Sequence, residues 1–115
     1  MRIEVRGRNT QVTDELRKHV AKRFARVGRQ VSDLATLEVE LREERNPAIA
    51  DRMVADAKLH LKGATLKATE ASPDMLHSIH ALAEDVRRQV KRHREKRRKR
   101  SQTRRIMDRM RRRTA

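Results

Sequence analysis

Lysine and arginine are concentrated toward one end of this 115-residue chain. From Arg87 to Arg113 there are sixteen of them against two acids, Glu95 and Asp108, whereas residues 1–86 hold fifteen bases and fourteen acids. Guanidinium and ammonium groups neutralise phosphates and release condensed counterions, which supplies most of the sequence-independent affinity of proteins for nucleic acids. The pattern therefore predicts that this segment binds RNA or DNA, rather than staying a solvated charged tail.

No other group of residues has the spacing of a catalytic or metal site. His77 and His80 stand three apart, which on a helix places two ligands on neighbouring positions, but a third ligand is not apparent. The paired carboxylates Glu43-Glu44 and Glu84-Asp85 lie among charges that keep them ionised and exposed. There is no nucleophile motif and no glycine-rich phosphate loop. We expect no enzyme activity, no metal, no cofactor and no small-molecule substrate.

The composition also restricts the mode of binding and the compartment. Phe24 is the only Phe, Trp or Tyr, and its place in an apolar stripe predicts a core position, so bases cannot stack on exposed aromatic rings. Recognition must then use phosphates, sugars and shape, which suits structured RNA. The chain has no cysteine, no export signal at its amino terminus and no apolar run long enough to span a membrane. We expect a cytoplasmic protein without membrane contacts.

The elements that position the cations follow from hydrophobic periodicity. Strict alternation predicts strands at 1–8, 37–42, 52–62 and 64–69. Apolar residues at steps of three and four predict helices at 14–30 and from 73 to about 90. Thr13 is the expected N-cap of the first helix, and Ser72 that of the second, with Pro73 at the first helical position.

These elements predict an α+β fold of the order β-α-β-β-β-α. The crossover makes the first two strands parallel, and hairpins add the other two antiparallel. Each strand has one apolar face and each helix one apolar stripe, so we expect a two-layer sandwich: a four-stranded mixed sheet with both helices packed on one face. A folded RNA-binding domain should span 1–94. An Arg/Lys-rich extension, 95–115, should be helical or disordered, since close like charges repel.

The order of the elements, together with short strings along the chain, resembles the ribosome hibernation-promoting factor family, which includes the stress-induced ribosome-associated inhibitor. The strings, which cover about residues 1–95, are Gly7-Arg8-Asn9, Val12-Thr13, Gly63 to Leu66, Ala68 to Glu70, Asp74-Met75, and Arg88-Gln89 with Lys91, Arg92 and His93. The resemblance implies binding to the small ribosomal subunit in the decoding channel, over the messenger and transfer RNA sites, which keeps ribosomes inactive under stress or in stationary phase. Long members add a C-terminal dimerisation domain, and this chain resembles the short ones.

We therefore predict a ribosome-binding translation inhibitor that contacts the 16S-type rRNA of the small subunit and is a monomer off the ribosome. The alternative is a general nucleic-acid-binding protein acting on DNA or transfer RNA. A membrane-surface helix is a weaker alternative, because Ile106, Met107 and Met110 form a small apolar face. The basic residues of the first helix fit a solvated face as well as an RNA contact. The predicted RNA-binding residues are Arg87, Arg88, Lys91, Arg92 and Arg94, then Arg97 and Arg98 in the extension, and secondarily Arg8, Lys18, Lys22 and Arg26.

Overall fold

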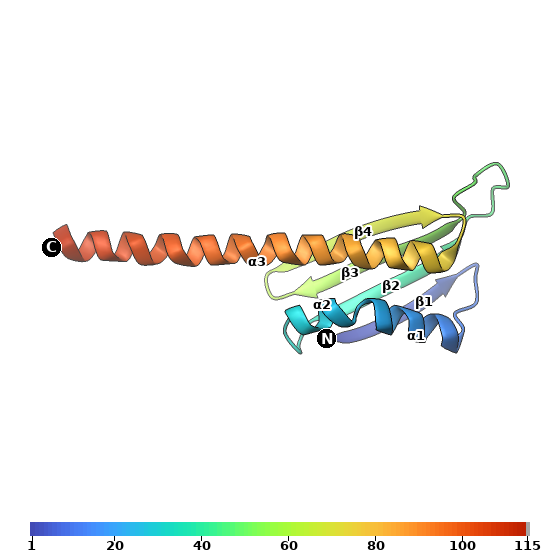
Figure 1. The fold of residues 1–115 in the computed structure, drawn as a ribbon, viewed down its shortest axis with the longest axis horizontal. Coiled ribbons are helices and arrows are strands. Elements are labelled where there is room, and N and C mark those ends of the chain that lie inside the picture. Colours follow the sequence, from blue (N-terminus) through green and yellow to red (C-terminus); the bar gives the residue numbers. More distant parts are fainter. Residues whose placement is uncertain (115) are drawn as a thin grey trace.

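The computed structural model describes the backbone of residues 1–114 and the side chains of residues 1–112. The chain forms one sheet covered on one face by helices, with the last helix projecting far beyond it (Figure 1). This confirms the predicted α+β sandwich. In chain order the elements are β1 (Arg2–Arg8), α1 (Asp14–Arg23), α2 (Ala25–Gln30), β2 (Thr36–Glu43), β3 (Met53–Leu61), β4 (Ala64–Ser72) and α3 (Met75–Thr114).

The sheet has the order β1-β2-β3-β4, with β1 parallel to β2 and both later pairs antiparallel, as predicted. Its register aligns apolar residues across all four strands. One row runs Val5, Val39, Ala57, Ala68 from β1 to β4. Because side chains alternate between faces along a strand, this row and its neighbours give the sheet one continuous apolar face.

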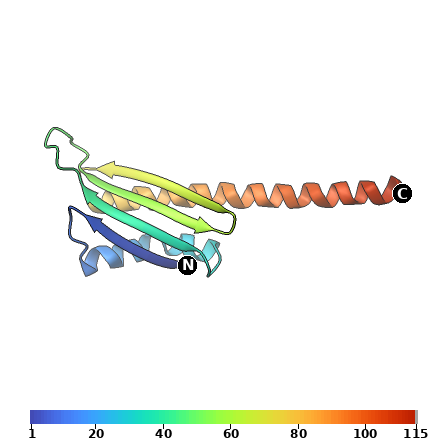
Figure 2. The same ribbon diagram turned by 180° about the vertical axis from the view of Figure 1, so that it is seen from behind.

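The core lies between that face and the helices, which Figure 2 shows together behind the sheet. α1 and α2 follow one another end to end over the β1 side, and α3 lies over β3 and β4. Both predicted apolar stripes are buried, apart from their first members, Leu16 and Met75, which are half-buried. The fully buried large side chains include Val20, Phe24, Val27, Leu37, Val39, Leu41, Leu59, Ile79, Leu82, Val86 and Val90.

The first helix was predicted as one piece, and the structure divides it at Phe24. Phe24 has φ −92° and ψ 4°, outside the helical range, so α1 ends before it and α2 begins after it. The hydrogen bonds from Phe24 N to Val20 O and from Gly28 N to Phe24 O, both 3.0 Å, are still made. The interruption is therefore a bend, and the apolar stripe continues through it with Phe24 fully buried.

The start of α3 also differs from the prediction. Ser72 is the last residue of β4 rather than an N-cap, and Pro73 precedes the helix, which begins at Met75. Asp74 takes the capping role, because its Oδ1 accepts a hydrogen bond from Leu76 N at 3.2 Å. The Ser72 hydroxyl still accepts a hydrogen bond from Asp74 N at 3.2 Å, and it also lies 2.6 Å from the buried Ser78 hydroxyl.

Of the two predicted states of the extension, residues 95–114 have the helix, and Ala115 lies outside the described residues. α3 runs unbroken from Met75 to Thr114, across the boundary predicted at 94 and 95. Val90 is its last buried residue. We call residues 91–114 the overhang; at 1.5 Å per residue it measures about 36 Å. It accounts for the elongated shape, which extends 69 × 29 × 17 Å.

Candidate nucleic-acid interface

Most of the predicted RNA-binding residues lie on α3 with their side chains in solvent. Arg88, Lys91, Arg92 and Arg94 are exposed, as are Arg97 and Arg98 at the start of the overhang. A helix holds these residues at fixed angles about one axis, so their sequence spacing determines which of them can contact the same ligand.

Seven cations of α3 fall on one side of the helix. Their successive separations are four, three, four, seven, four and three residues, which keeps every member within one face at 3.6 residues per turn. We call this row the basic stripe. Its members are Arg87, Lys91, Arg94, Arg98, Arg105, Arg109 and Arg112. Four of them were predicted. The last three were missed because the extension was treated as a bulk charge, although the three-and-four spacing that identifies the apolar stripes would have found them.

The basic stripe faces the side of the molecule where α1 and α2 lie. Gln89 Nε2 donates to the Lys67 carbonyl of β4 at 2.8 Å, which fixes the side of α3 that lies over β4. Arg87 and Lys91 stand two positions before and after Gln89, and residues two apart on a helix point in nearly opposite directions. Arg88 and Arg92 project from other faces of the helix and do not join the stripe.

Arg87 differs from the rest of the stripe because it is already partly engaged. Its side chain is half-buried, and its Nη2 donates to Glu84 Oε2 at 2.9 Å. Its Nε is buried and has no hydrogen-bond partner. A phosphate near Arg87 would thus compete with Glu84, whereas the exposed Lys91 and Arg94 are available as they stand.

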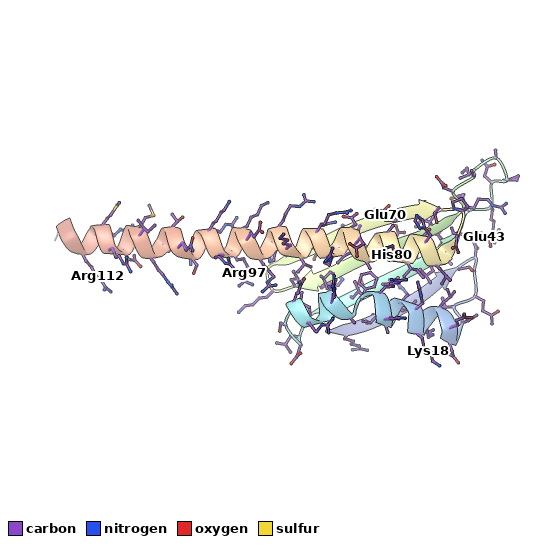
Figure 3. The ribbon with its side chains drawn as sticks, viewed as in Figure 1. Lys18, Glu43, Glu70, His80, Arg97 and Arg112 are labelled. Atoms are coloured by element: carbon purple, nitrogen blue, oxygen red, sulfur yellow. The ribbon has the colours of Figure 1, made fainter. Side chains whose placement is uncertain are left out.

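The predicted cations of α1 and α2 are exposed. Arg17 Nη1 donates to the Val5 carbonyl of the edge strand β1 at 3.4 Å, so this side of α1 lies at the outer edge of the sheet. Lys18 points away from α3 (Figure 3). Lys22 lies one turn after Lys18 on α1, and Arg26 lies on α2, beyond the bend at Phe24.

Arg8 does not join this surface. It ends β1, and the cavity of about 250 Å³ that it lines also contains the acids Glu43 and Glu44. Asn9 beside it accepts a hydrogen bond from Arg45 Nη2 at 2.8 Å. Figure 1 shows the ends of β1 and β2 at the opposite end of the sheet from the overhang. The charge around Arg8 is mixed, unlike the stripe.

Several charges on the open face of the sheet pair with each other. Arg42 forms an ion pair with Asp56, which also accepts a hydrogen bond from Thr69 Oγ1 at 2.6 Å. Glu38 Oε2 lies 2.8 Å from His60 Nε2. This hydrogen bond lowers the pKa of the Glu38 carboxyl. This pairing depends on the strand register, which the sequence alone does not give.

Two other classes of site are absent from residues 1–114, the part of the chain that the structure describes. No group of three or more His, Asp or Glu side chains there is placed to hold a metal ion. No helix there is long and apolar enough to cross a membrane. Ile106, Met107 and Met110 are the exposed apolar side chains of the overhang, each between 53% and 62% exposed.

Comparison with known proteins places this arrangement in a family. The model of the family described as sigma 54 modulation protein / S30EA ribosomal protein matches residues 3–98. A ribosome hibernation promoting factor of Azotobacter vinelandii is 30% identical over 108 residues, 94% of this chain and 96% of that protein. One of Salmonella typhimurium is 29% identical over 96 residues, 84% of this chain and 96% of the relative.

Solved structures agree with the fold. The N-terminal domain of Thermus thermophilus Protein Y superposes with a TM-score of 0.70 and 26% identity, covering 81% of this chain and 99% of the domain. A ribosomal subunit interface protein from Coxiella burnetii, 19% identical, gives the same TM-score over 83% of this chain and 99% of its own. The matched family model spans the sheet and the helices packed on it, which confirms the resemblance found in the sequence: this chain belongs to the sigma 54 modulation protein / S30EA ribosomal protein family.

Proposed function

We propose that this protein is a ribosome hibernation factor that docks in the decoding channel of the small ribosomal subunit. There it would cover the sites of messenger and transfer RNA and keep ribosomes inactive under stress or in stationary phase. It acts by occupying a site and not by catalysis, needs no cofactor, and works in the cytoplasm as a monomer until it meets the ribosome. The observation that carries the proposal is the near-complete match of the folded body to relatives named as ribosome hibernation promoting factors.

The charge distribution suits this role. Phosphate contacts from Lys91, Arg94 and Arg98 would provide affinity, because each contact releases counterions from the RNA. The folded body supplies shape, which is how proteins recognise structured RNA when they do not read base edges. Arg26, exposed on α2, which packs beside α3, would add a cation from the body. The open sheet face, where Arg42 pairs with Asp56 and Glu38 with His60, would contribute less to phosphate binding.

The first test is where the protein sediments and how salt changes that. In a sucrose gradient of cell lysate the protein should travel with small subunits or whole ribosomes at low salt. Its affinity for purified subunits should fall linearly on a log–log plot against salt concentration. Binding that does not change between low and moderate salt would contradict the phosphate-contact mechanism.

The second test places the protein on the subunit. Chemical probing of the 16S-type rRNA should show protection in the decoding channel, and added messenger and transfer RNA should reduce it. Protection confined to another surface of the subunit would refute the proposed site while leaving ribosome binding intact.

A general nucleic-acid-binding role is the second candidate, and one observation favours it. The family match ends at residue 98, whereas the basic stripe continues to Arg112. Cations beyond the matched region could bind any phosphate lattice. If this role dominates, the protein will sediment with DNA or free transfer RNA, and an excess of unrelated duplex will strip it from ribosomes.

A further inference from the structure

A cavity of about 510 Å³ lies where α3 leaves the folded body. Three segments form its walls: the loop between α2 and β2, the β3–β4 hairpin, and the α3 turns from Val90 to Arg97. Much of its lining is apolar. The apolar side chains are Val31, Leu34, Ala35, Leu61 and Val90. The volume falls within the range of small-molecule sites in proteins, about 300–1,000 Å³.

Leu34 is the most exposed large apolar side chain of the described residues, at 93%. The turn that carries Leu34 is held by two hydrogen bonds to Ser32. Leu34 N donates to Ser32 Oγ at 3.1 Å, and Ala35 N donates to the Ser32 carbonyl at 3.0 Å. This turn holds the leucine at the edge of the cavity, where a ligand with a flat apolar surface would remove it from water.

The rim of the cavity is cationic. Lys62, Arg94 and Arg97 line it, and no carboxylate does. Two histidines also line it, and they differ in their hydrogen bonds. Both ring nitrogens of His60 have hydrogen-bond partners: Nε2 lies 2.8 Å from Glu38 Oε2, and Nδ1 lies 3.4 Å from Thr65 Oγ1. His93 has a buried Nε2 without any partner, a costly arrangement unless a ligand or water supplies one.

We propose that this cavity binds one unpaired nucleotide of a structured RNA. The base would lie against Leu34 and the apolar lining, with its polar edge toward His93, and its phosphate would lie at Arg94 and Arg97. The inference rests on the proposed RNA-binding function and adds a site that reads an extruded nucleotide. Arg94 belongs both to the rim and to the basic stripe, so a strand that follows the stripe passes the mouth of the cavity.

The absence of exposed Phe, Tyr and Trp makes such a cavity useful. Proteins that hold single bases usually stack them on aromatic rings. This chain has only the buried Phe24. An aliphatic cavity with guanidinium groups at its rim is an alternative way to remove one base from water. An acidic peptide with one apolar side chain shares these two chemical features, so the test includes it.

The test uses the full-length protein and two fluorescent RNA hairpins that differ by a single unpaired uridine. Wild-type protein should bind the bulged hairpin about fivefold more tightly, the low end for a held base because no aromatic ring takes part. Leu34→Ser should bring the affinity ratio of the two hairpins to about one. Leu76→Ser, 41% exposed on the first turn of α3 and outside the cavity, should leave the ratio unchanged. Both variants keep the net charge.

Each other outcome has a distinct meaning. Equal affinity of the wild type for both hairpins overturns the cavity proposal and leaves the proposed function untouched. Failure to bind either hairpin or ribosomes overturns both. A 4-thiouridine at the bulge should cross-link to residues 31–36 or 60–62, and cross-links confined to other segments would refute the site. If a peptide of alternating glutamate and leucine displaces the bulged hairpin from the wild type but not from Leu34→Ser, and the bulge gives no preference, the cavity is a peptide site.

Discussion

The hydroxyl oxygens of Ser72 and Ser78 lie 2.6 Å apart where β4 ends and α3 begins. Ser78 is fully buried, and its hydroxyl also donates to the Met53 carbonyl of β3 at 2.7 Å. One side chain of the helix is thus tied to two neighbouring strands. These contacts set the position from which α3 crosses the sheet and projects beyond it.

Ser78→Ala should therefore lower the free energy of unfolding by about 1–3 kcal/mol, because it removes the buried hydroxyl that bonds the Met53 carbonyl and the Ser72 hydroxyl. Ser101→Ala removes the same hydroxyl from the same helix at an exposed position and should change stability by less than about 0.5 kcal/mol. Urea denaturation of the two variants measures the difference. Equal stability of the two would show that the buried hydroxyl contributes nothing.

Substitutions in the apolar stripe of α3 should lower the stability of the fold, whereas substitutions of its exposed cations should not. Ile79 is fully buried, so Ile79→Ala should cost roughly 2–5 kcal/mol of stability. Lys91 is exposed, so Lys91→Ala should stay within about 0.5 kcal/mol of the wild type. Thermal melts will rank the two variants, and the reverse order would mean that the helix packs with another face.

The Glu38–His60 pair predicts a pH-dependent contribution to stability. The hydrogen bond from His60 lowers the pKa of Glu38 in the folded protein. A lowered carboxyl pKa stabilises the fold above the ordinary glutamate value, and this stabilisation is lost as pH falls through the lowered value. The wild type should thus be more stable than Glu38→Gln near neutral pH, and the difference should shrink in acid. Denaturation curves at several pH values measure it, and a gap that widens in acid would contradict the pairing.

The position of a cation around α3 should matter more than its number. Replacing Arg98, Arg105 and Arg109 by Ala removes three charges from the basic stripe. Replacing Arg92, Lys96 and Lys99 removes three from other faces. The stripe variant should bind ribosomal subunits more weakly and with a shallower salt dependence, by about 0.7–0.9 in slope for each phosphate that is no longer neutralised. Identical salt slopes for the two variants would show that charge alone, and not the stripe, decides binding.

Removal of residues 96–115 separates the body from most of the overhang. Both buried stripes and all four strands remain, so the truncated protein should melt near the temperature of the full chain. It should bind ribosomes more weakly and with a smaller salt slope, but still inhibit cell-free translation at high enough concentration. If inhibition disappears even when the ribosomes are saturated, the overhang and not the body blocks translation.

Most of the fold was predictable from the sequence because its signals are local. Alternation located the strands, and the spacing of Val20, Phe24 and Val27 located the buried face of the first helix. The errors occur where a tertiary contact decides the local structure. Ser72 has the side chain of an N-cap, but it is the last residue of β4 and bonds the buried Ser78, and the helix begins two residues later with Asp74 as its cap.

The candidate site was predictable only in part, for the same reason. The side of α3 that carries Lys91 and Arg94 follows from helical spacing, and both residues were located from the sequence. The cavity beside them could not be predicted, because Leu34, Leu61 and Val90 come from three segments that meet only in the folded chain. Nor could the pairing of Glu38 with His60, which depends on the register between β2 and β3.

Because the backbone of α3 is unbroken, the packing of its first part on the sheet fixes the rotation of the overhang about the helix axis. Each residue inserted into α3 would rotate all later side chains by about 100° around the helix axis. An insertion of about eighteen residues would add roughly five full turns and return those side chains to their original directions. One extra alanine after Arg94 would thus keep every cation and every buried contact, yet swing Arg98, Arg105 and Arg109 out of line with Lys91. The number of residues between the buried part of α3 and its overhang therefore sets the direction in which these cations point.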